Sequence, residues 1–188
     1  MFKKFFLTFV TSFSIFFLFF MYNSIIVNAD NGNIVDSNGN NIISGKSYSI
    51  LISWGSTTSK DVYLTGDEFK SSNGKGSLFQ ITNIDGSMGN TIPENGLFNI
   101  RNDSTGQVWN WKSNFTTVSV QLADSIIKDV TEVGYMQSSS FAVGDPGIKS
   151  NGVHNYELIA GGAYGLGYDW NNTIGLVNNA ETEFAFVP

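Results

Sequence analysis

One histidine and no cysteine limit the catalytic chemistry available to this chain. His154 lies in the Gly/Asn-rich string SNGVHNY, where a turn is expected. A Ser-His-Asp triad on a strand-to-helix elbow needs the G-x-S-x-G pattern, which the chain lacks. Catalytic zinc sites usually need two or more histidines. We therefore interpret His154 as a solvated loop residue and expect no hydrolytic triad and no metal site.

Carboxylates could act in pairs, because glycoside hydrolysis uses two of them at a set separation. Each candidate sits in a turn, where an acidic side chain is expected for local backbone reasons. The candidates are Asp36, Asp61, Asp67, Glu68 and Asp85. The glycine clusters also lack the strand, loop and helix context of a phosphate cradle. We expect a protein that binds rather than an enzyme, and we expect no cofactor.

Aromatic side chains offer a second kind of site. The string Gln107-Val108-Trp109 is similar to the Q-x-W motif that recurs in ricin-type trefoil lectins, where it packs in the core of each leaf. This resemblance implies a carbohydrate-binding alternative, with Tyr168 and Trp170 stacking on a sugar and Asp169 and Asn171 forming hydrogen bonds. One motif occurs where three would be expected, and in a protein of about twelve strands Trp109 is more often a core residue.

Short alternating or β-branched runs between Gly, Asn, Ser and Asp clusters predict strands along most of the chain, with little helical periodicity. About twelve strands with regular turns are typical of a sandwich or barrel. We predict strands at 48–53, 61–64, 77–82, 96–101, 108–112, 117–122, 131–136, 140–144, 155–159, 164–168, 174–177 and 183–187. The polar string 69–76 is predicted as a loop.

Two similar strings indicate an internal repeat. Residues 78–83 read LFQITN and residues 97–102 read LFNIRN, and the string FAV at 141–143 echoes both. A third of the chain after residue 29 is about 53 residues, near the length of one trefoil leaf. The pattern predicts equivalent strands around a pseudo-threefold core.

Two turns shape the stretch 34–50. Ile34 and Val35 are predicted to open a strand, residues 36–40 to form a turn, and Ser44-Gly45 to form a second one. The pattern of an apolar pair, D-x-x-G-N-x-I and a later Y-x-I resembles the N-terminal signature of the Kunitz-type soybean trypsin inhibitor family. The resemblance implies an all-β protein, a β-trefoil, secretion and, as in many members, protease inhibition.

The resemblance extends over nearly all of the chain after residue 29. The strings at 156–159, 165–168, 174–177 and 184–186 follow the family's closing order, whereas 122–140 fits least well. Plant members normally carry disulfides, and this chain has none. The hydrophobic core alone must hold the fold.

In inhibitory members a reactive loop between the fourth and fifth strands enters a protease cleft. The resemblance places this loop at 83–107 and implies that Phe98, Asn99, Ile100 and Arg101 form its tip, with Asn99–Ile100 as the scissile bond. It also implies that Ser44 supports the loop from inside, where the family has an asparagine.

Asn99 stands where trypsin-directed members have Arg or Lys, and a trypsin-like pocket requires a long cation. Arg101 could supply that cation in a shifted register, or the target could accept Asn99 or Phe98. In the alternative interpretation, Phe98 and Ile100 alternate into the core of a strand, with Asn99 and Arg101 solvated.

Residues 1–29 carry two lysines, an apolar run and a terminal Ala29, which is typical of a cleaved secretory signal peptide. We expect a single domain at 30–188 that is secreted, monomeric and not inserted in a membrane. The chain has 10 Lys+Arg against 16 Asp+Glu, and this acidic balance argues against nucleic acid as a partner. The expected partner is a protease, or alternatively a glycan or another protein.

Overall fold

The computed structural model describes residues 32–54, 62–66, 70–72, 76–114, 117–132, 134–148, 152–160, 164–168, 174–176 and 182–188. Their regular structure is all β. The strands are β1 (Ser47–Trp54), β2 (Val62–Thr65), β3 (Lys70–Ser72), β4 (Leu78–Asn83), β5 (Phe98–Asn102), β6 (Val108–Ser113), β7 (Val118–Ala123), β8 (Val130–Glu132), β9 (Tyr135–Ser138), β10 (Phe141–Ile148), β11 (His154–Ala160), β12 (Tyr164–Tyr168), β13 (Ile174–Leu176) and β14 (Thr182–Val187). Within these segments there is no helix long and apolar enough to span a bilayer.

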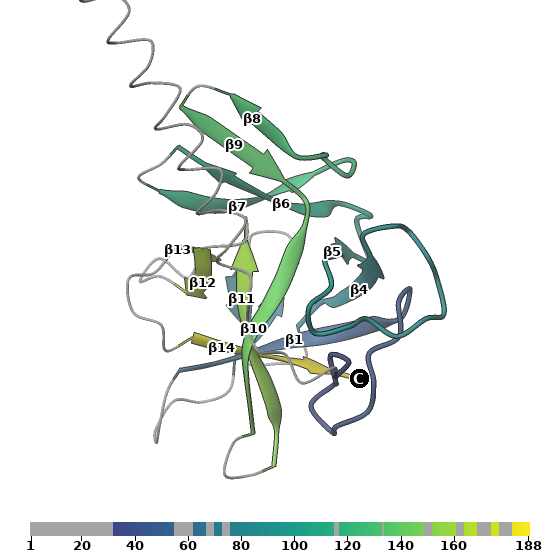
Figure 1. Ribbon diagram of the computed structural model, residues 1–188. Helices are drawn as coiled ribbons and strands as arrows, with labels where there is room; N and C mark the ends of the chain where they lie inside the picture. Colours follow the sequence, from purple (N-terminus) through teal and green to yellow (C-terminus); the bar gives the residue numbers. More distant parts are fainter. Residues whose placement is uncertain are drawn as a thin grey trace, which may run out of the picture.

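Six strands close a barrel. β1 pairs with β4, β4 with β5, β5 with β10, β10 with β11, β11 with β14, and β14 returns to β1, all antiparallel. In Figure 1, β10 and β11 run side by side through the middle of the molecule and β1 crosses beside β14. Closing the ring in this way removes free edges from its strands.

One hairpin follows the first barrel strand of each third of the chain. β2–β3 lies between β1 and β4, β6–β7 between β5 and β10, and β12–β13 between β11 and β14. β13 also pairs with β7, which joins two of these hairpins. A six-stranded barrel with three such hairpins is a β-trefoil, so the predicted fold class is confirmed.

Fourteen strands are described where about twelve were predicted. The predicted strand 131–136 is wrong, because Gly134, with φ of 88°, separates β8 from β9 and the two form an additional hairpin. β9 pairs with β6, and Figure 1 shows this hairpin beyond β6 and β7. The predicted loop 69–76 also contains a strand, because β3 pairs with β2.

The barrel interior is filled by aromatic and β-branched side chains. Trp109 packs edge-on against Phe79 and Phe141, with ring centroids 5.5 and 6.1 Å apart. Phe186 lies 6.2 Å from Phe98 and 6.4 Å from Tyr156. The Phe79–Trp109 and Phe98–Phe186 pairs join strands of different thirds, so aromatic packing links the barrel without disulfides.

The N-terminal segment 32–46 lies against the barrel. The turn predicted at 36–40 is present, because Asp36 Oδ1 accepts from the backbone N–H groups of Asn38 and Asn40. The predicted strand at Ile34 and Val35 is wrong, because the segment forms only isolated bridges. A barrel side chain instead holds its backbone in place, because the N–H of Val35 donates to the hydroxyl of Tyr156 at 2.8 Å.

Candidate functional site

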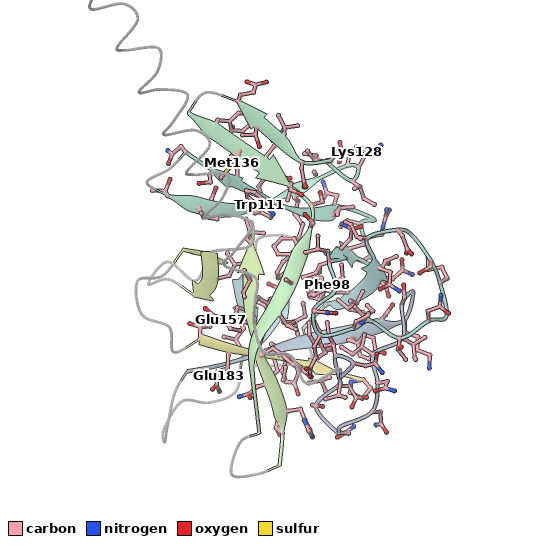
Figure 2. The ribbon with its side chains drawn as sticks, viewed as in Figure 1. Phe98, Trp111, Lys128, Met136, Glu157 and Glu183 are labelled. Atoms are coloured by element: carbon pink, nitrogen blue, oxygen red, sulfur yellow. The ribbon has the colours of Figure 1, made fainter. Side chains whose placement is uncertain are left out.

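The segment Phe98 to Arg101 lies in the barrel wall as part of β5. Its register with β4 pairs Phe98 with Asn83 and Ile100 with Ile81. Phe98 and Ile100 are completely buried. In Figure 2, Phe98 lies inside the ribbon beside β10, in agreement with its pairing to Phe141.

The polar residues of this segment are engaged within the protein. Asn99 is 3% exposed, and its Nδ2 donates to the carbonyl of Ser139 at 2.7 Å. Arg101 is half-buried and donates from Nη1 to the carbonyl of Gly106 at 3.1 Å. The prediction that Phe98 to Arg101 form an exposed tip with a scissile Asn99–Ile100 bond is therefore wrong. A protease could reach that bond only after β5 had separated from β4.

The exposed part of the predicted loop precedes β5. Between β4 and β5, Ile84, Met88 and Leu97 are 47%, 60% and 41% exposed. Single exposed apolar side chains are common, but several on one loop often mark an interaction surface. This loop contains the candidate functional site.

Ser44 braces the first half of this loop, residues 83–90, which we call the arch. The buried Ser44 hydroxyl donates to the carbonyl of Ser87 and accepts from the N–H of Asn83 at 2.9 Å. Its backbone carbonyl accepts from Gly89, and its N–H donates to Asn90. Four hydrogen bonds from one buried residue thus hold both arms of the arch. The structure places Ser44 under the loop, the position that the family resemblance implied.

Ser87 is the most constrained residue of the arch. Its carbonyl accepts from Ser44, its hydroxyl accepts from Asn83 Nδ2 at 3.1 Å, and its N–H donates to Asp85 Oδ1 at 2.8 Å. The backbone N–H of Ser87, followed by its hydroxyl, lowers the pKa of the exposed Asp85 carboxyl below its ordinary value. The carboxylate that forms this turn is therefore ionised at neutral pH.

The second half of the loop is tied to the N-terminal segment. Ile92 is completely buried, its carbonyl accepts from Ile34 and its N–H donates to Ile42. Bridges also join Asn33 to Pro93 and Ile43 to Thr91. The projecting part of the loop is therefore the arch.

Met88 lies between the two braced residues Ser87 and Gly89 and is 60% exposed. A Cβ on Gly45 would come within 2.5 Å of Met88 Sδ, so the thioether rests on this glycine. Gly45 has φ of 90°, which other residues rarely adopt. The arch thus presents one long apolar side chain on a backbone fixed at both sides. The pairs Asp85-Gly86 and Met88-Gly89 are the sequence signal for a projecting turn at this place. The sequence-based prediction placed the tip at Phe98 to Arg101 instead.

The sugar-binding alternative falls largely outside the described residues. Tyr168 ends β12, and Asp169, Trp170 and Asn171 lie outside the described segments. Trp109 of the Q-x-W motif is fully buried between Phe79 and Phe141. The motif is part of the core, and the sugar site stays a prediction.

Among the described residues considered for catalysis, Asp36 and Asp85 each serve a local turn. His154 begins β11, not a loop, and packs its Nε2 near Gly39. Asp36 caps its own turn and Asp85 belongs to the arch, whereas Asp61, Asp67 and Glu68 lie outside the described residues. Among the described residues, no three His, Cys, Asp or Glu side chains group as metal ligands.

No protein-family model and no curated protein matches the chain. Among solved structures, the fold is similar to that of trypsin inhibitor 1 from Senna obtusifolia, with 14% identity and a TM-score of 0.48. The match covers 84% of this chain and 98% of the inhibitor. A similarity of this size shows nothing about function, and the β-trefoil assignment follows from the strand pairing.

Proposed function

We propose that this chain is a secreted β-trefoil protein that inhibits a protease by inserting the arch into its cleft. The observation that carries the proposal is the set of four hydrogen bonds from Ser44 that hold the arch on both sides of Met88. Met88 is then the side chain that enters the partner's pocket. Phe98 to Arg101 support the arch from β5 and do not touch the partner.

A fixed loop suits this role because association is opposed by the ordering of flexible segments. An immobilised side chain costs about 0.5–1.5 kcal/mol, and a loop already held in place avoids part of this loss. The turn closed by Asp85 and the brace from Ser44 restrict the arch before it meets a partner. The arch is therefore preorganised for binding.

The composition of the arch favours a protease with an apolar specificity pocket. No Lys or Arg occurs between Asn83 and Ile100, so the arch has no cation for a trypsin-like pocket. Met88 is unbranched and adaptable, which suits an apolar slot. Ile84 lies in the same loop as a second exposed apolar contact.

Inhibition assays with a panel of chymotrypsin-like, trypsin-like, cysteine and asparaginyl proteases test the proposal. We expect the wild-type protein to inhibit a chymotrypsin-like enzyme and Met88→Glu to lose that inhibition. Ile126→Glu is the matched control, because Ile126 is 47% exposed in the β7–β8 connection, which is not part of the arch. Absence of inhibition across the panel, or equal inhibition by wild type and Met88→Glu, would overturn the proposal.

Secretion is part of the same proposal. Residues 1–29 lie outside the described segments, and their charged and apolar pattern supports removal as a signal peptide. Expression of the full chain in a secreting host, followed by N-terminal sequencing of the medium, tests this. We expect a mature protein that begins at Asp30, and retention of the intact chain in the cell would contradict it.

A further inference from the structure

Two methionines in the described segments have opposite environments. Met88 is 60% exposed on the arch, whereas Met136 is 7% exposed in β9, where its backbone pairs with Ser113 of β6 and Thr131 of β8. Figure 2 labels Met136 within the hairpin region formed by these strands. Oxidation of methionine follows its exposure to solvent, so the more exposed Met88 is expected to react first.

We propose that Met88 is a reversible oxidation site that switches the arch between an apolar and a polar binding surface. A lone pair of Sδ attacks one oxygen of hydrogen peroxide, and the O–O bond breaks. Hydroxide leaves as the S–O bond forms, and it takes up the proton of the transferred oxygen. The sulfur is thereby oxidised by two electrons to a sulfoxide, and the peroxide is reduced to one water. The binding consequence rests on the proposed function, whereas the selective oxidation rests on the exposure of Met88.

The geometry explains why the reaction would change the surface without unfolding the loop. Met88 Sδ rests against Gly45, where even a single added carbon would approach it to 2.5 Å. An oxygen added to Sδ must therefore point to solvent or displace the side chain from Gly45. The four hydrogen bonds from Ser44 go to Asn83, Ser87, Gly89 and Asn90, and none uses the Met88 side chain. The arch keeps its backbone, and its apolar contact becomes polar.

Titration of the purified mature protein with hydrogen peroxide, followed by peptide mass spectrometry, tests the selectivity. We expect the peptide with Met88 to gain one oxygen before the peptide with Met136 does, and both to react alike in denaturant. Equal rates in the folded protein, or faster oxidation of Met136, would overturn the proposal. Methionine sulfoxide reductases should restore the original mass of the Met88 peptide, and failure to do so would contradict reversibility.

Inhibition assays on the same samples test the switch. We expect oxidised wild type to lose inhibition of the chymotrypsin-like enzyme. The inhibition constant of Met88→Leu, which has no sulfur at this position, should be the same before and after peroxide treatment, whatever its starting value. Unchanged inhibition by the Met88 sulfoxide would overturn the switch. Absence of inhibition before oxidation would instead refute the proposed function, while the mass measurement would still decide whether Met88 is selectively oxidised.

Discussion

Two segments of the predicted loop, the arch and residues 98–101, contrast in how they are held. Hydrogen bonds from side chains hold the arch in place: Ser44 lies beneath it and Asp85 closes its turn. Residues 98–101 are held by the strand pairing between β4 and β5 and by packing in the core. A segment held by a brace can project into solvent, whereas a segment held in a barrel ladder cannot. The contrast identifies which of the two can contact a partner.

Truncation of the barrel segment should have the largest effect on stability. Phe98→Ala removes a fully buried ring that packs on Phe186, and we expect a loss of about 3–5 kcal/mol in the free energy of unfolding. Met88→Ala on the arch should change it by less than about 0.5 kcal/mol. Denaturant unfolding of both variants measures this difference, and similar losses would break the comparison.

Removal of the brace should have an intermediate effect. Ser44→Ala leaves the carbonyl of Ser87 and the N–H of Asn83 without their hydroxyl partner, and we expect a loss of about 1–3 kcal/mol. Hydrogen exchange should speed up at Asn83 but not at Ile100 in the ladder. Ser104→Ala is the control, because it removes a serine hydroxyl that donates to Asn102 Oδ1 in an exposed turn outside the arch. Unchanged exchange at Asn83 would show that Ser44 does not hold the arch.

A smaller effect is expected where the N-terminal segment that carries Ser44 meets the barrel. Tyr156→Phe removes the acceptor of the Val35 N–H, which should cost about 0.5–1.5 kcal/mol. Burial raises the pKa of the Tyr156 hydroxyl above 10.0. Between its unfolded and folded pKa values the native state holds more protons, so stability should fall as pH rises above about 10.

Unfolding of wild type and Tyr156→Phe between neutral and alkaline pH measures this contribution. We expect the stability difference between them to shrink as the pH passes 10.0 toward the raised pKa of Tyr156. A difference that stays constant over this range would contradict the assigned environment of the hydroxyl.

The smallest effect is expected at the turn of the arch. The pKa of Asp85 lies below 3.8 because Ser87 hydrogen-bonds the ionised form, so the turn should persist until the pH falls through that lowered value. The amide resonance of Ser87 should then report the titration by NMR, and Asp85→Asn should abolish it. A midpoint at or above 3.8 would argue against this hydrogen bond.

The sequence predicted the general fold well because local patterns specify turns and strands. Asp36 and Gly39 fix the first turn through their own backbone chemistry, and the FQI and FNI strings alternate into the barrel as period-two strands do. Short strands were harder to predict. β3 and β8 have three residues each and few apolar side chains, so no periodicity marks them.

The exact position of the site could not be predicted from the sequence because exposure depends on distant partners. Asn99 is buried by its bond to Ser139, forty residues further along the chain. Nothing near Asn99 in sequence indicates that bond. The alternative interpretation, in which Phe98 and Ile100 alternate into the core, was closer to the structure, although Asn99 is buried rather than solvated.

Side-by-side inhibition constants of Met88→Glu and Arg101→Ala against one chymotrypsin-like protease test most directly whether the arch, and not β5, contacts the partner. We predict that Met88→Glu weakens inhibition by at least about tenfold, or 1.4 kcal/mol, while Arg101→Ala leaves it unchanged. A loss confined to Arg101→Ala, with Met88→Glu as potent as wild type, would contradict the assignment.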